Sequence, residues 1–153
     1  MLVNSDFKEL LSIFSDKQVK YLVVGGYAVM KYTEPRYTKD LDLWVKADSE
    51  NSQSVFDALR LFGAPLSNLT PQDFSHEGYF YQMGVPPIRV DILMSVVGVT
   101  FDIAWRQREQ VSIEGVVVPF ISKHHLIICK RATGRPQDLL DANALEQAAA
   151  TTP

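Results

Sequence analysis

Three aspartates are the residues of this chain whose type and spacing could carry chemistry. Asp40 and Asp42 are separated by one residue within an alternating segment, and Asp91 interrupts a later apolar run between Val90 and Ile92. Because alternate side chains of a strand share a face, Asp40 and Asp42 are expected to project together. Clustered carboxylates are the hard oxygen ligands that Mg²⁺ takes, and Asp91 could complete a clamp for two ions.

A pair of glycines adds phosphate chemistry to this prediction. Gly25 and Gly26 follow a short apolar run and precede a segment of helical character, so the turn could bring backbone N–H groups close to a phosphate. Each feature alone has an ordinary explanation, because turns use glycine and surface strands carry aspartates for solubility or edge protection. An aspartate flanked by apolar residues, however, costs stability unless it is exposed or paired. The combination favours a metal and phosphate site.

Hydrophobic periodicity predicts the elements that must position these residues. Strands are expected at residues 21–24, 40–45, 79–82, 88–93 and 116–118. Helices are expected around residues 7–14, 27–31, 55–62, 100–108, 122–133 and 136–149. Strands and helices without regular βαβ alternation predict an α+β fold with a mixed sheet. We expect one domain over residues 1–150 and a frayed tail at 151–153.

Composition excludes several classes of protein. The chain has 153 residues, 46% of them hydrophobic and 22% charged, with a net charge of -3, which is typical of one globular domain and lacks a broad electrostatic footprint for nucleic acid. The single cysteine, Cys129, fits a reducing compartment and is expected to be a buried, inert thiol. The longest mostly apolar stretch, residues 22–30, is far shorter than the ~20 residues of a membrane span. A cytoplasmic protein without membrane association is expected.

Two segments resemble a known family. Residues 23–26 (VVGG) followed by residues 36–43 (RYTKDLDL) resemble the glycine-pair and Asp-x-Asp signature of the polymerase-β-type nucleotidyltransferase superfamily. More narrowly, two patterns resemble a small bacterial and phage group related to abortive-infection and toxin nucleotidyltransferases: residues 35–42 (PRYTKDLD), through Pro35, Arg36, Thr38, Asp40 and Asp42, and residues 130–141 (KRATGRPQDLLD).

The resemblance implies a mixed-sheet core that transfers an NMP from an NTP to a hydroxyl acceptor and releases pyrophosphate. Gly25 and Gly26 would hold the triphosphate, and Asp40 and Asp42 would bind two divalent ions, Mg²⁺ or alternatively Mn²⁺. Asp91 would share the second ion and help to activate the attacking hydroxyl. The sequence departs from many relatives in having Gly26 where they carry serine, which removes a hydroxyl that could contact phosphate.

Basic residues near these motifs are candidates for nucleotide contact. Arg36 and Lys39 flank the carboxylates and could neutralise triphosphate charge, although a solvated loop beside acidic residues explains them equally well.

A second basic cluster lies between the last two predicted helices. The resemblance implies a nucleotide contact for Lys130, whereas Asp138 and Asp141 are expected to be structural, pairing with Arg135 or Lys130.

The acceptor stays open at this stage. It could be a tRNA or other RNA, a protein or a small antibiotic-like molecule, and a toxin or phage-defence role would imply an antitoxin-like partner protein. A competing hypothesis is a catalytically silent module that binds or regulates a partner protein. A second alternative is a nuclease or phosphohydrolase that uses the same carboxylates.

Overall fold

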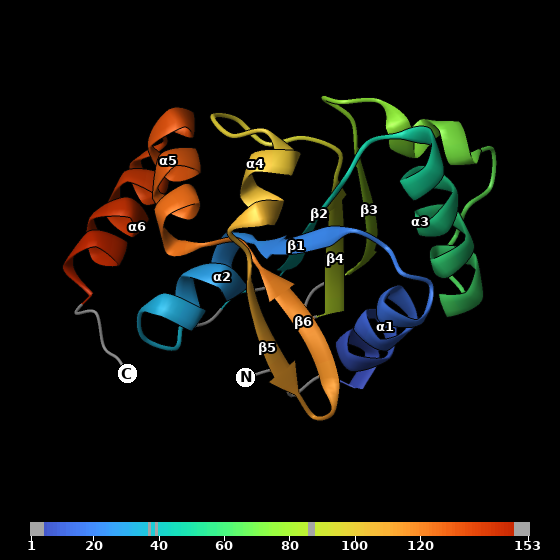
Figure 1. Cartoon of the computed structure of the whole chain (residues 1–153), viewed down its shortest axis with the longest axis horizontal. Helices are drawn as coiled ribbons and strands as arrows, with labels where there is room; N and C mark the ends of the chain where they lie inside the picture. Colours follow the sequence, from blue (N-terminus) through green and yellow to red (C-terminus); the bar gives the residue numbers. More distant parts are fainter. Residues whose placement is uncertain (1–4, 37, 39, 86–87, 149–153) are drawn as a thin grey trace.

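The fold is a six-stranded mixed sheet with helices packed against it (Figure 1). The computed structural model describes residues 5–36, 38, 40–85 and 88–148. The strands, in the sheet order β3-β4-β2-β1-β6-β5, are β1 (Tyr21–Val24), β2 (Asp40–Val45), β3 (Phe80–Val85), β4 (Ile88–Leu93), β5 (Glu109–Ile113) and β6 (Val116–Phe120). The predicted α+β class is therefore confirmed.

Within the described residues, six α-helices and a 3₁₀ turn complete the architecture. They are α1 (Ser5–Asp16), α2 (Gly25–Tyr32), α3 (Ser49–Phe62), η1 (Pro71–Ser75), α4 (Phe101–Arg106), α5 (Lys123–Thr133) and α6 (Pro136–Gln147). In Figure 1, α1 and α3 lie to the right of the sheet, whereas α2, α5 and α6 gather on the left. No helix in the described ranges is long and apolar enough to span a membrane. The predicted tail at 151–153 lies outside those ranges.

The predicted elements are present, but several of their bounds differ, and η1 has no predicted counterpart. Helix α3 begins at Ser49, earlier than expected, because the Asp48 side chain accepts a hydrogen bond from the Asn51 amide and caps it. Strand β3 is longer than the predicted segment 79–82 and continues to Val85. Strand β5 was not predicted, because it is a short, largely exposed edge strand whose alternation is carried by only Val111 and Ile113.

The position of β2 in the sheet decides where the aspartates lie. It pairs antiparallel with β1 and parallel with β4, which places Asp42 opposite Val24 on one side and opposite Asp91 on the other. Leu41 and Leu43 are fully buried, as the alternation predicts. Because Asp42 lies between them in the strand, its side chain projects from the opposite face of the sheet.

The start of α3 is tied to β1 and β2 through one buried amide. The Asn51 side chain accepts a hydrogen bond from the Lys20 amide (2.8 Å) and donates to the carbonyls of Lys20 (3.0 Å) and Lys46 (2.8 Å). Asn51→Ala would leave the Lys20 amide and the Lys46 carbonyl without this partner, while the Lys20 carbonyl would keep only its bond from the Lys46 amide (3.1 Å). We therefore expect a loss of about 2–4 kcal/mol in the free energy of unfolding by urea. Gln53→Ala, an exposed change in the same helix, is the control. An equally small loss in both variants would contradict this role.

Candidate active site

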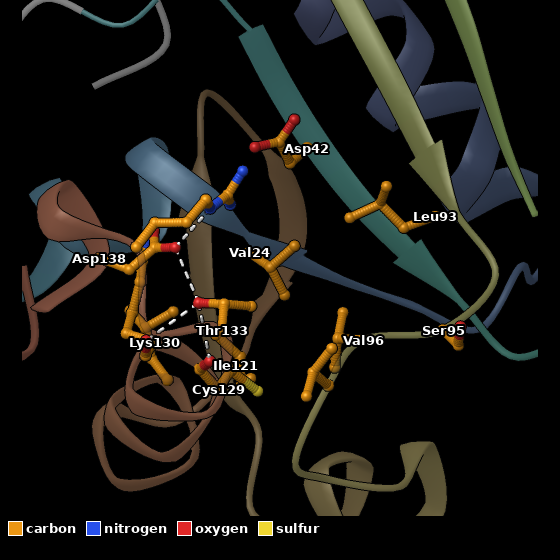
Figure 2. A pocket seen from close by; sticks show the side chains of 14 residues that line it. Val24, Asp42, Leu93, Ser95, Val96, Ile121, Cys129, Lys130, Thr133 and Asp138 are labelled. Atoms are coloured by element: carbon orange, nitrogen blue, oxygen red, sulfur yellow. Dashed lines mark hydrogen bonds and ion pairs between the residues drawn. The ribbon is translucent and has the colours of Figure 1, made fainter. Parts of the chain in front are cut away.

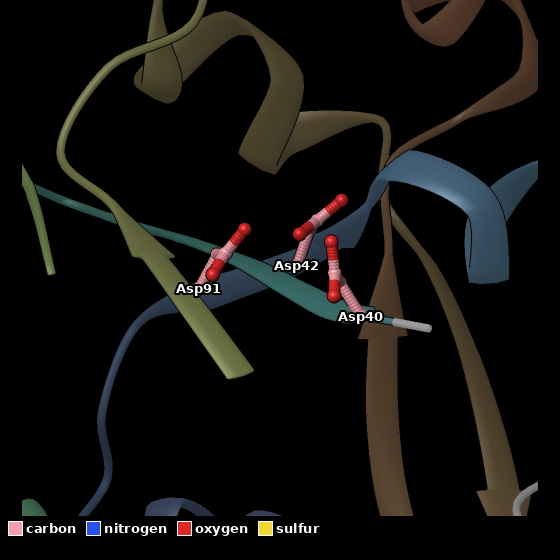
Figure 3. Close-up of side chains that lie close together, drawn as sticks. All are labelled: Asp40, Asp42 and Asp91. Carbon is pink, nitrogen blue, oxygen red and sulfur yellow. The ribbon is translucent and has the colours of Figure 1, made fainter. Parts of the chain in front are cut away.

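The three predicted carboxylates lie together on two neighbouring strands. Asp40 and Asp42 of β2 and Asp91 of β4 project from the same side of the sheet toward one another (Figure 3). One carboxylate oxygen from each lies within 4.8 Å of the others. The cluster exists because the parallel register sets Asp42 beside Asp91, while the two-residue spacing along β2 adds Asp40 on the same face.

The electrostatics of Asp42 reflect this crowding. Burial, the negative charges of Asp91 and Asp40, and a hydrogen bond with Asp91 raise the pKa of Asp42 from 3.8 to about 7, against a smaller opposing effect of Lys130. A carboxyl group that is costly to ionise in the free protein is one that a cation would stabilise strongly, because the ion offsets the repulsion.

The donor set fits a divalent metal ion. Oδ1 of Asp40 is buried and makes no hydrogen bond, which is unusual for a buried carboxylate oxygen. Mg²⁺ and Mn²⁺ prefer carboxylate oxygens of this kind. A buried oxygen that makes no hydrogen bond, within a cluster of three carboxylates, is therefore the arrangement expected of residues that hold such an ion.

Arg89 is a member of this site that the sequence analysis missed. Its Nε lies 3.5 Å from Oδ1 of Asp40 and 3.4 Å from Oδ1 of Asp91, and these carboxylates raise the pKa of Arg89, the hydrogen bond to Asp91 being the largest cause. Arg89 precedes Asp91 by two residues, so alternation along β4 alone would have placed both on one face. The guanidinium offsets part of the negative charge of the cluster.

The glycine turn packs directly against the carboxylates. Gly25 opens α2 with φ of +71°, and a Cβ at this position would lie 2.0 Å from Oδ2 of Asp42. A Cβ on Gly26 would lie 2.7 Å from Oγ1 of Thr38, so a serine at this position would require Thr38 to move. Because the first amides of a helix lack intrahelical acceptors, the turn presents N–H groups next to the aspartates.

A pocket of about 290 Å³ extends from the glycine turn toward α5 (Figure 2). Gly25, Asp42 and Lys130 contribute to its lining, together with Val24, Leu93, Ser95, Val96, Val97, Ile121, Leu126, Cys129, Thr133, Arg135 and Asp138. Cys129 is half-buried, where a buried thiol was expected. Burial still raises the pKa of the thiol to about 11, so the thiol stays neutral near pH 7. The pocket thus combines an apolar wall with charged groups, among them Asp42, Lys130 and Asp138.

The basic residues predicted to contact nucleotide form ion pairs where the structure describes them. Lys130 lines the pocket and forms ion pairs with Asp138 (3.4 Å) and Asp141 (3.3 Å). Arg36 does not face the carboxylate cluster as a free cation, because both of its terminal nitrogens donate to Asp141. Lys39 lies outside the described residues. The expected pairing of Asp138 and Asp141 with basic neighbours is therefore confirmed, with Arg36 as an additional partner.

Comparisons with known proteins agree on one kind of protein. Residues 2–147 match the family described as nucleotidyltransferases of unknown function (DUF6036). The solved structure of the lincosamide antibiotic adenylyltransferase LnuA, bound to lincomycin, is similar with a TM-score of 0.59 and 16% identity, covering 96% of this chain and 98% of that one. The structure of ANT(2'')-Ia in complex with adenylyl-2''-tobramycin gives 0.57 and 12%, covering 92% and 85%. The curated proteins include no match.

Proposed function

The chain belongs to the family of nucleotidyltransferases of unknown function (DUF6036), and we propose that it transfers an NMP from an NTP to a hydroxyl group of a small molecule. The observation that carries this proposal is the cluster of three carboxylates beside a glycine turn, at the end of a pocket that a basic residue also lines. We further propose that Asp40, Asp42 and Asp91 bind two Mg²⁺ ions, or Mn²⁺ in their place. When bound, such ions would supply positive charge that offsets the negative charge developing on the leaving group.

The residues of the chain would then divide the work of positioning and proton transfer. The backbone N–H groups of Gly25 and Gly26 would bind the triphosphate at the N-terminus of α2. The acceptor oxygen forms a bond to the α-phosphorus, the bond from that phosphorus to the bridging oxygen breaks, and pyrophosphate leaves. The carboxylate of Asp91 would take the proton of the attacking hydroxyl.

The preference for a small-molecule acceptor is supported by the structural neighbours. LnuA is named a lincosamide antibiotic adenylyltransferase and is bound to lincomycin, and ANT(2'')-Ia is named an antibiotic-resistance factor and is seen in complex with adenylyl-2''-tobramycin. A protein or RNA acceptor would instead indicate a toxin or phage-defence enzyme, for which an antitoxin-like partner would be expected. We place the enzyme in the cytoplasm, where NTPs are available and where a lone cysteine stays reduced.

A labelling experiment tests the proposed function. The purified protein would be incubated with Mg²⁺, a cell extract and each α-labelled NTP in turn, and the label would be followed into RNA, protein and small molecules while pyrophosphate is measured. We expect Mg²⁺-dependent labelling of small molecules and release of pyrophosphate. The double variant Asp40→Ala/Asp42→Ala should do neither.

Two other outcomes of that experiment would overturn the proposal. Release of orthophosphate or cleavage of nucleic acid would identify a phosphohydrolase or a nuclease. A protein that shows no Mg²⁺-dependent binding of NTP, and that the double substitution leaves unchanged, would be a catalytically silent binding module.

A further inference from the structure

Five charged side chains meet where α5, α6 and the loop after α2 come together. We call Arg36, Lys130, Arg135, Asp138 and Asp141 the anchor cluster. Both carboxylates are buried, with side chains only 7% (Asp138) and 4% (Asp141) exposed. Three basic groups face two carboxylates, so the cluster carries one net positive charge.

Asp141 is the centre of this cluster. Its carboxylate accepts two hydrogen bonds from the guanidinium of Arg36 and one from Nε2 of Gln137 (3.0 Å), and Nζ of Lys130 lies 3.3 Å away. Burial alone would raise the pKa of Asp141, but these hydrogen bonds and the charges of Lys130 and Arg36 bring it below its ordinary value. Asp141 is therefore ionised near neutral pH and holds both cations at once.

Asp138 fixes Lys130 from a second direction. It lies 3.4 Å from Nζ of Lys130 and accepts hydrogen bonds from Oγ1 of Thr133 (2.7 Å) and Nε of Arg135 (2.8 Å), some of which are visible in Figure 2. Lys130 is thus held between two carboxylates, although lysine has a flexible side chain that is costly to immobilise.

The two cations that Asp141 holds lie beside the glycine turn. Nη2 of Arg36 is 3.6 Å from the position that a Cβ on Gly26 would occupy. Lys130 lines the same pocket as Gly25 and Asp42. Its charge acts against the rise in the pKa of Asp42. A buried ion pair is by itself a weak source of stability, because desolvation offsets the attraction. Its place next to the predicted phosphate site suggests a different use.

We infer that Asp141 is a positioning residue, which holds Arg36 and Lys130 beside the glycine turn so that they bind the polyphosphate of the nucleotide. This inference rests on the proposed function and extends it to a residue that touches no substrate. Cations that are already held in place lose little side-chain entropy when they bind an anion.

Binding of inorganic tripolyphosphate, measured by titration calorimetry without metal, tests this role separately from catalysis. For Asp141→Asn we expect an affinity about tenfold lower than that of the wild type, because charge-assisted hydrogen bonds of this kind are lost, and a rise in KM for NTP that exceeds the fall in kcat. AMP binding should be unchanged. Arg36→Lys, which keeps the charge but loses the two-pronged contact, should give a smaller loss and serves if Asp141→Asn does not fold.

A matched control separates positioning from stability. Glu146 lies in α6, as Asp141 does, and forms an exposed ion pair with Arg131 of α5. Glu146→Gln removes this pair and should leave tripolyphosphate affinity and KM unchanged. If Asp141 were purely structural, Asp141→Asn would lower the melting temperature without changing tripolyphosphate affinity. That result would overturn this inference and leave the proposed function standing. A wild-type protein that binds neither tripolyphosphate nor NTP would overturn the proposed function as well.

Discussion

Asp42→Asn should make the metal-free protein more stable at pH 8 and, in the same variant, greatly slow nucleotidyl transfer. Burial and the nearby charges of Asp91 and Asp40 raise the pKa of Asp42 to about 7, so ionisation of this carboxyl group destabilises the folded protein. Asparagine has nearly the same shape and carries no charge, so it avoids this destabilisation. It also provides a poorer ligand for a divalent ion, and we expect activity to fall on the order of 10³-fold.

The sign of the pH dependence follows from the raised pKa. Below the unfolded-state pKa of 3.8, the carboxyl group is protonated in both states and makes no difference to stability. Between pH 3.8 and about 7 the folded state binds more protons than the unfolded state, so the free energy of unfolding falls as pH rises. Above pH 7 the full cost remains, at most about 4 kcal/mol at ~1.4 kcal/mol per pKa unit.

Thermal unfolding in EDTA at pH 5 and pH 8 measures this effect. The variant should gain several degrees over the wild type at pH 8 and less at pH 5. Mg²⁺ should raise the melting temperature of the wild type more at pH 8, where no proton need be displaced, and should have little effect on the variant. Asp57→Asn, at a position in α3 remote from the carboxylate cluster, is the control. A variant no more stable than the wild type at pH 8 would show that Asp42 carries no such strain.

Local sequence rules were sufficient for the parts of the site that lie on one strand. The alternation of Asp40, Leu41, Asp42 and Leu43 places two carboxylates on one face whatever the neighbours of the strand are. The break in an apolar run marks Asp91 for the same reason, since an aspartate there needs a partner or solvent. Gly25 follows a strand and opens a helix, and its positive φ explains why glycine stands there.

The parts that could not be predicted depend on which distant segments meet. Nothing in the sequence near Arg36 indicates that its guanidinium reaches Asp141, because this contact joins residues more than a hundred positions apart. Arg89 could be placed on the face of Asp91, but its contact with Asp40 requires the parallel register of β2 and β4. Register and crossover are properties of the whole sheet, and one-residue changes in them move every side chain to the other face.

Gly25→Ala should disable the site through geometry alone, without removing any functional group. The backbone at Gly25 has φ of +71°, a conformation that costs other residues about 1–2 kcal/mol. The added Cβ would also lie 2.0 Å from Oδ2 of Asp42 and 2.9 Å from its Cγ, distances that no packed structure tolerates. The carboxylate of Asp42 would have to move away from Gly25 and from its place beside Asp91 and Asp40, so both the Mg²⁺-dependent rise in melting temperature and activity should be lost.

Gly63→Ala isolates the steric part of this prediction. Gly63 ends α3 with φ of +97°, and a Cβ there would meet nothing within 4 Å. This variant therefore has the backbone strain of a positive φ without a steric clash. We expect both variants to lose stability, but only Gly25→Ala to lose the response to Mg²⁺ and the transfer of label from NTP. If Gly25→Ala kept the wild-type Mg²⁺ response, the carboxylate of Asp42 could not be a ligand in the position seen here. The close approach of Gly25 to Asp42 would then reflect helix packing alone, and the glycine turn would have no part in holding the metal site together.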